Sequence, residues 1–142
     1  MSEVKGGITL VIGAIGGGFT AIFGGWSQGL NVLLICMVID FITGVVGALM
    51  SKSLKTDSGG INSRVTWKGL IKKITTLLIV ALGCQLDQLL GTEIIQSACI
   101  YGFMFNEVTS IVENTAIIGV PMPKIINEAL DMIKAKENDN LQ

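Results

Sequence analysis

The chain has 142 residues, of which 50% are hydrophobic and 15% charged, and its mean hydropathy is +0.66. Soluble domains carry about 25% charged residues, so this composition excludes an ordinary soluble globule, a disordered tail and a nucleic-acid binder. The chain is too short for two ordinary domains, it contains no histidine, and its net charge of −1 hides an uneven distribution.

The first third of the chain predicts two membrane spans separated by a short break. No charged side chain lies between Gly6 and Ile39, and about 20 apolar residues are enough to cross a bilayer. The glycine-rich stretch at 24–29, which includes Trp26, is typical of a break. We therefore predict spans at 6–23 and 30–50. Glycine is tolerated in the first span because small residues let membrane helices approach closely.

Residues 51–73 form a basic connector that sets the predicted topology. It holds six of the ten Lys and Arg residues: Lys52, Lys55, Arg64, Lys68, Lys72 and Lys73. The positive-inside rule places such a connector in the cytoplasm. With four spans, both termini are then cytoplasmic too. The end of the connector, 65–73, mixes apolar residues with lysines and suits a helix start at the level of the lipid headgroups.

Two further spans are predicted at 74–91 and 94–114. Only a few residues around Gly91 separate them, so they should form a tight antiparallel hairpin. The tail, 119–142, starts with two prolines that stop the preceding helix, and apolar residues at helical spacing then predict an amphipathic helix at 124–136. The chain is thus a single all-α integral membrane domain of about four transmembrane helices, followed by this C-terminal amphipathic helix.

Small residues recur at every fourth position in the first part of the chain. They are Gly13, Gly17, Ala21, Gly25 and Gly29, and the second span repeats the spacing at Gly44 and Ala48. A continuous helix would place the first five on one smooth ridge, which favours close helix packing in lipid. The spacing leaves open whether this packing occurs within one subunit or between subunits.

Carboxyl groups lie within the predicted spans. A charged carboxylate at mid-bilayer costs about 2.5–3.5 kcal/mol on insertion scales, so it normally faces protein or water. Asp40 shares a helix face with Thr43 and Gly44, and it lies at a depth similar to that of Glu107. Asp87 is expected to reach the membrane interface. Three interpretations of Asp40 and Glu107 stay open: a hydrogen-bonded core network, a pore lining, or a proton relay.

The predicted fourth span is the most polar one. Asn106, Thr109, Ser110 and Glu113 fall on one stripe, and Glu107, Ser110 and Asn114 fall on a second that overlaps it. Such a helix matches lipid poorly over half of its surface. It is suited to lining an aqueous lumen or to packing against other subunits.

The side chains of this chain do not suggest an enzyme. Without histidine no catalytic triad can form, and the cysteines Cys36, Cys84 and Cys99 lie singly in separate apolar stretches. We expect these cysteines to be packing residues, and we expect no metal site and no cofactor.

Four short motifs follow one another along residues 30–130: Asp40-x-x-Thr43-Gly44, Lys68-Gly69-x-x-Lys72-Lys73, Asn106-Glu107-x-x-Ser110-Ile111-x-Glu113-Asn114 and Gly119-x-Pro121-x-Pro123. Together they resemble the toxin-secretion/phage-lysis holin family. The resemblance implies a small phage or prophage protein in the cytoplasmic membrane of a bacterium. Such a protein assembles into a high-order homo-oligomer and opens lesions that release a cell-wall-degrading endolysin or, in some relatives, a large toxin.

Three classes of function therefore compete. A holin would permeabilise the membrane by associating with copies of itself, and it would serve its endolysin or toxin without binding it stably. A small ion or proton channel, or a transporter subunit, would use Asp40 and Glu107 as ion sites. A membrane scaffold would conduct nothing.

Overall fold

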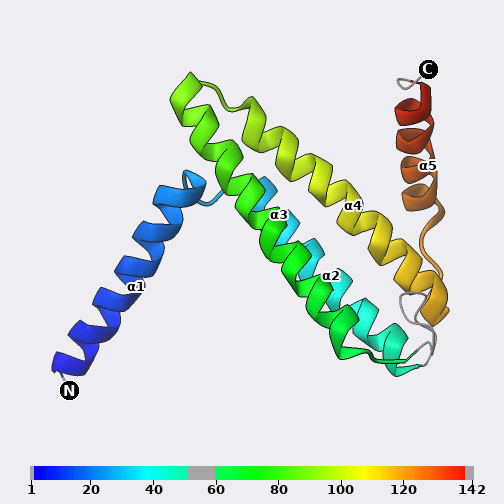
Figure 1. Ribbon diagram of the computed structural model, residues 1–142, viewed down its shortest axis with the longest axis horizontal. Helices are drawn as coiled ribbons and strands as arrows, with labels where there is room; N and C mark the ends of the chain where they lie inside the picture. Colours follow the sequence, from blue (N-terminus) through cyan, green and yellow to red (C-terminus); the bar gives the residue numbers. More distant parts are fainter. Residues whose placement is uncertain (1, 51–59, 140–142) are drawn as a thin grey trace.

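A computed structural model describes residues 2–50 and 60–139, and every element in them is a helix. The helices are α1 (Ser2–Phe23), α2 (Gln28–Leu49), α3 (Ser63–Leu90), α4 (Ile94–Ile118) and α5 (Lys124–Asp139). Figure 1 shows α2, α3 and α4 as a bundle in which α3 runs antiparallel to the other two, while α1 and α5 stand apart. The all-helical prediction is confirmed for this part of the chain.

The break between the first two helices lies where the glycines predict it. Gly24 and Gly25 have φ of 73° and 115°, a left-handed region that side chains with a Cβ rarely adopt. Ser27 then caps α2, because its Oγ accepts a hydrogen bond from the Leu30 N–H at 3.1 Å. The break also ends the predicted small-residue ridge, since Gly25 lies in the turn and Gly29 belongs to α2.

The end of the predicted connector is helical, as its mix of apolar residues and lysines predicts, and the helix begins two residues before 65. Asn62 caps a helix that starts at Ser63 and continues without interruption to Leu90. At 1.5 Å per residue α3 is about 42 Å long, so its first turns extend beyond the length needed to cross the hydrocarbon. The basic residues Arg64, Lys68, Lys72 and Lys73 are therefore part of α3, whereas Lys52 and Lys55 lie outside the described residues.

The bundle has its apolar core near the α3–α4 hairpin. The buried side chains that form it are Leu30, Leu33 and Met37 of α2, Val80 of α3 and Ile100 of α4. Glycine brings the helices together there: a Cβ on Gly83 would lie 3.1 Å from the Cα of Gln96, and one on Gly29 would lie 3.2 Å from the Ile100 side chain. These two contacts bring α4 close to both of its neighbours, and of the two glycines only Gly29 was among the predicted packing residues.

The α3–α4 hairpin is closed by a buried carboxylate. Gly91 ends α3 with φ of 68°, and the Asp87 side chain then accepts hydrogen bonds from the N–H groups of Ile95 at 3.0 Å and Gln96 at 2.7 Å. The hydroxyl of Thr92 also donates to it. Asp87 is only 5% exposed. The prediction that Asp87 lies at the membrane interface stays a prediction, and the structure adds that the free N–H groups at the start of α4 bind its carboxylate.

Helix α1 meets the bundle only near its C-terminal end (Figure 1). Gln85 of α3 donates to the carbonyls of Ala21 and Ile22, and Gln96 of α4 donates to that of Phe23. Gly13 and Gly17 are exposed, and a Cβ on either would meet no atom within 4 Å. Of the predicted ridge, Gly13 and Gly17 thus pack against no other described residue, whereas Gly29 contacts Ile100. In α2, by contrast, Gly44 does contact another helix, with the Asn114 amide 3.6 Å from its Cβ position.

By length and composition, three of the described helices can cross a membrane, over Val4–Phe23, Gln28–Leu49 and Ser63–Leu90. The first of these segments has none of its residues buried. Helix α4 is not in this group because its polar residues lower its hydropathy, although its 25 residues are long enough. A fourth span therefore stays a prediction. So does membrane contact by α5, whose helix follows Pro121 and Pro123 as the sequence predicts.

Candidate functional site

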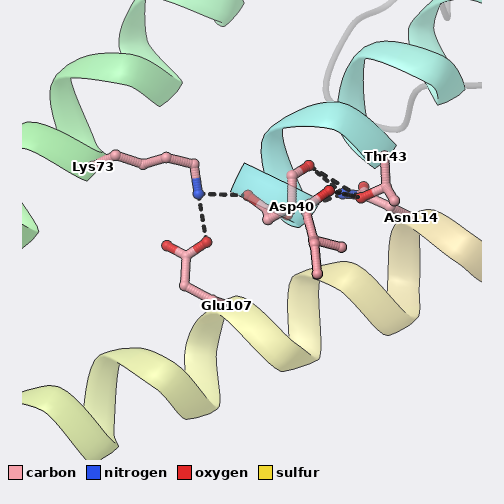
Figure 2. Close-up of polar contacts among 6 residues, drawn as sticks. Asp40, Thr43, Lys73, Glu107 and Asn114 are labelled. Atoms are coloured by element: carbon pink, nitrogen blue, oxygen red, sulfur yellow. Dashed lines mark hydrogen bonds and ion pairs between the residues drawn. The ribbon is translucent and has the colours of Figure 1, made fainter. Parts of the chain in front are cut away.

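The polar centre of the bundle is a lysine held between two carboxylates (Figure 2). Lys73 Nζ of α3 lies 2.8 Å from Asp40 Oδ2 of α2 and also donates to Glu107 Oε2 of α4. The three side chains are 15%, 11% and 13% exposed, respectively. One ammonium group thus joins three helices and balances one of the two negative charges.

Asn114 extends this cluster along α4. Its amide donates to Asp40 Oδ1 at 3.0 Å and lies 3.2 Å from the Thr43 hydroxyl. Thr43 in turn lies within hydrogen-bonding distance of the carbonyls of Ile39 and Asp40. No buried side-chain nitrogen or oxygen among the described residues lacks a hydrogen-bond partner. We call Asp40, Thr43, Lys73, Glu107 and Asn114 the ionic cluster.

Helix register brings these residues together. Lys73 shares a face of α3 with Val80, Cys84 and Asp87, at i+7, i+11 and i+14, and all three of these are buried. Asp40 and Glu107 lie about 18–20 Å along their helices from the hairpin end, so the cluster is well inside the length of the bundle. Removing Lys73 would leave two carboxylates without a positive partner inside the bundle, which is far more costly than losing an exposed charge.

The predicted polar residues fall into two groups. Asp40, Thr43 and Glu107 belong to the ionic cluster, while Asn106 and Glu113 are exposed. Ser110 is half-buried between the two groups and takes part in an interaction of its own. The two adjacent stripes of α4 thus have different surroundings, because one packs against α2 and α3 and the other faces outward.

The outward stripe of α4 combines small and polar residues. Its members follow one another at steps of three or four residues, and all but the half-buried Thr109 are exposed: Ala98, Gly102, Asn106, Thr109, Glu113 and Ala116. Such steps keep a row of side chains on one helix face. No other helix of the described chain covers this stripe.

Two members of the ionic cluster, Lys73 and Asn114, are not among the predicted pore-lining or buried polar residues. The sequence alone indicates only a topological role for Lys73, because it follows Lys72 in a basic segment. Its spacing to Val80, Cys84 and Asp87 is the signal that identifies it as an inward residue. Asn114 was recognised on the second stripe of α4, and Gly44 beside it leaves room for its amide.

The described residues contain no group of three or more Cys, Asp or Glu side chains placed to hold a metal ion. Cys84 is buried and Cys36 and Cys99 are half-buried, with free thiols. The ionic cluster joins three helices through its ion pairs and hydrogen bonds.

Comparison with known proteins relates this chain to phage holins. The model of the bacteriophage holin family matches residues 17–135, starting in the last two turns of α1. A probable holin of Bacillus phage phi105 is 33% identical over 114 residues, covering 80% of this chain and 77% of that protein. An uncharacterised 14.9 kDa protein of Clostridium perfringens is 34% identical over 139 residues, covering 96% and 97%. No solved structure matches the chain.

Proposed function

Because the chain belongs to the bacteriophage holin family, we propose that it gathers into high-order homo-oligomers in the bacterial cytoplasmic membrane and opens lesions there. The lesions would release an endolysin, and so lyse the host cell, or a toxin. Family membership supports the holin role and the membrane location. The outward stripe of α4 is the observation that supports the oligomeric mechanism.

In the topology we propose, α1 to α4 each cross the membrane. The basic start of α3 and both termini then lie in the cytoplasm, and the turns before α2 and α4 lie outside. The support is the charge pattern: Arg64, Lys68 and Lys72 are exposed at one end of α3, and the opposite end carries no Lys or Arg. The α3–α4 hairpin places the start of α4 at that uncharged end.

This topology predicts which positions a membrane-impermeant maleimide reaches on intact spheroplasts before lysis begins. Glu93→Cys, in the outer hairpin, should be labelled at once, and Ser63→Cys only after the membrane is opened with detergent. The unsubstituted chain is the control, since its three cysteines lie within helices and are buried or half-buried. Labelling of Ser63→Cys from outside would contradict the proposed orientation.

The proposed mechanism starts from the energetic cost of the outward stripe. In a lone copy, Asn106 and Glu113 face lipid, where polar groups lose their hydrogen bonds to water. Packing against the same stripe of another copy shelters them, and Gly102 and Ala98 allow the two helices to approach closely. At high density, a ring of copies can turn these side chains toward a shared water-filled lumen. The uncovered small residues of α1 offer a second contact surface.

The decisive experiment removes the polarity of the stripe. Asn106→Leu/Glu113→Leu should accumulate in the membrane but release a co-expressed endolysin at least tenfold more slowly, because the lone copy no longer gains by associating. The measurements are the time of membrane depolarisation and the endolysin activity outside the cytoplasm. A Thr75→Leu/Ser97→Leu chain, altered at exposed positions away from the stripe, should behave like the original.

Purified protein in liposomes separates the remaining classes of function. Release of large dyes together with small ones supports a lesion. Flux of ions alone would contradict it in favour of a channel at Asp40 and Glu107, and the absence of any flux would indicate a scaffold. Unchanged endolysin release by the doubly substituted chain would remove the stripe from the mechanism.

A further inference from the structure

The start of α3 has an exposed side that points away from the bundle. Helix register places Arg64, Trp67, Lys68 and Ile71 on the side opposite the inward Lys73. All four are exposed, and the two apolar side chains, Trp67 and Ile71, are 63% and 47% exposed. Neither Arg64 nor Lys68 forms an ion pair with a described residue. We call these four residues the basic face of α3.

The basic face lies at the level of the lipid headgroups in the proposed topology, on which this inference rests. Helix α3 has 28 residues, of which about 20 are needed to cross the hydrocarbon. Counted back from Leu90, about 20 residues reach Ile71, so residues 63–70 extend roughly 12 Å beyond the hydrocarbon on the cytoplasmic side. Most of the basic face is therefore accessible to a protein surface there.

Helix α5 has an exposed side of the opposite charge. Ile125, Glu128 and Met132 follow one another at i, i+3 and i+7 on one side of the helix, and Asp131 lies beside Glu128. Ile125 and Met132 are 74% and 66% exposed, and neither carboxylate forms an ion pair with a described residue. Lys124, at the helix start, is the only basic residue in this stretch. We call the first four residues the acidic face of α5.

Helix α5 is placed to reach a second copy of the chain. It has 16 residues and is about 24 Å long, twice the diameter of a helix. Figure 1 shows it apart from the bundle, with α4 between it and the α3 of its own chain. Because α3 and α4 are antiparallel, the start of α3 and the end of α4 lie at the same end of the bundle (Figure 1). The two faces of neighbouring copies are thus at the same level of the membrane.

We propose that the acidic face of α5 in one copy packs on the basic face of α3 in a second copy. The two carboxylates lie against Arg64 and Lys68, and the apolar side chains of the two faces cover one another. Anionic headgroups would match only the charge and leave Ile125 and Met132 uncovered, whereas a second copy matches both. The contact joins two different surfaces, so every copy keeps one of each for a further copy and the assembly can grow.

The test is photocrosslinking in membranes of cells that express the full-length chain. A benzoylphenylalanine in place of Trp67 keeps an aromatic side chain on the basic face. Irradiation should give dimers in which this position is joined to the tryptic peptide 125–134 of α5. The same crosslinker in place of Leu78, exposed on the same side of α3 but about 16 Å deeper in the membrane, should give no such product.

Charge reversal shows whether the two faces select each other. Glu128→Lys/Asp131→Lys should lower the yield of this dimer at least fivefold, because like charges then meet. Adding Arg64→Glu/Lys68→Glu to the same chain should restore most of the yield. The control, Lys72→Gln, removes a charge about 100° around the helix from Ile71 and should leave the yield unchanged.

A crosslinker in place of Tyr101, exposed beside the outward stripe of α4, reports on association of copies in general. Dimers at 101 without the α5 dimer at 67 would overturn this contact and leave the proposed oligomer standing. Products at 67 that join α5 within one copy, another peptide or lipid alone would also overturn it, as would failure of the fourfold reversal to restore the yield. The α5 dimer at 67 combined with unchanged endolysin release by Asn106→Leu/Glu113→Leu would support this contact and remove the stripe from the mechanism.

Discussion

Lys73→Met should leave little folded protein in the membrane. The substitution removes the only ammonium group of the ionic cluster and leaves Asp40 and Glu107 facing each other within the bundle. Breaking a buried ion pair by removing one partner costs about 3–5 kcal/mol, a large share of the stability of a small domain. The measurements are the amount of protein in isolated membranes and the midpoint of unfolding by sodium dodecyl sulfate in mixed micelles.

A matched pair of variants shows whether the effect comes from the cluster. Lys72→Met removes a neighbouring lysine that is exposed and should leave the unfolding midpoint almost unchanged. Lys73→Met/Asp40→Asn/Glu107→Gln removes all three charges and should restore most of the stability, because no uncompensated charge then remains. Equal stability of the two single variants would show that the ionic cluster does not hold the helices together.

Asp87→Ala should open the α3–α4 hairpin. The Asp87 carboxylate accepts three hydrogen bonds around the start of α4, and removing it leaves two backbone N–H groups without an acceptor. Loss of an N-cap alone costs about 0.5–2 kcal/mol, and hydrogen bonds to a charged group contribute more than neutral ones. We expect the free energy of unfolding to fall by about 2–4 kcal/mol in the same micelle assay.

Asp87→Asn separates hydrogen bonding from charge at this position. The amide keeps one accepting oxygen but has no negative charge to interact with the positive end of the α4 dipole. The stability of the Asp87→Asn chain should therefore lie between that of the original chain and that of the Asp87→Ala chain. The exposed neighbour, Leu86→Ala, is the control for position. If Asp87→Ala unfolds at the same detergent concentration as the original chain, the carboxylate does not determine the hairpin.

Local signals along the chain predict the helices well. Glycines at 24 and 25 and at 91 mark turns because only a residue without Cβ adopts positive φ at no cost, and the helices do end there. The segment 65–73 predicts the start of α3 to within two residues, although a series of lysines is also typical of a solvent-exposed connector. Their long side chains allow the helix to continue from the headgroups into the membrane.

The candidate site was predictable only in part. The carboxyl groups of Asp40 and Glu107 are conspicuous because charge is rare in apolar segments, and the structure brings them together. The choice between Lys72 and Lys73 depends on a rotation of about 100° per residue, which only the buried face of α3 fixes. The hydrogen bonds of Asp87 are not predictable from residue types, because two of its partners are backbone N–H groups, which are the same in every sequence.

The attachment of α1 has a consequence for how this chain tolerates change. Its link to the rest consists of hydrogen bonds to the carbonyls of Ala21, Ile22 and Phe23 and the packing of Phe19 and Phe23 on the core. Everything before Phe19 could be shortened, lengthened or exchanged without opening the interior of the other helices. Variation in the residues before Phe19 therefore changes the contacts of α1 with other molecules in the bilayer, while the packing of α2, α3 and α4 stays the same.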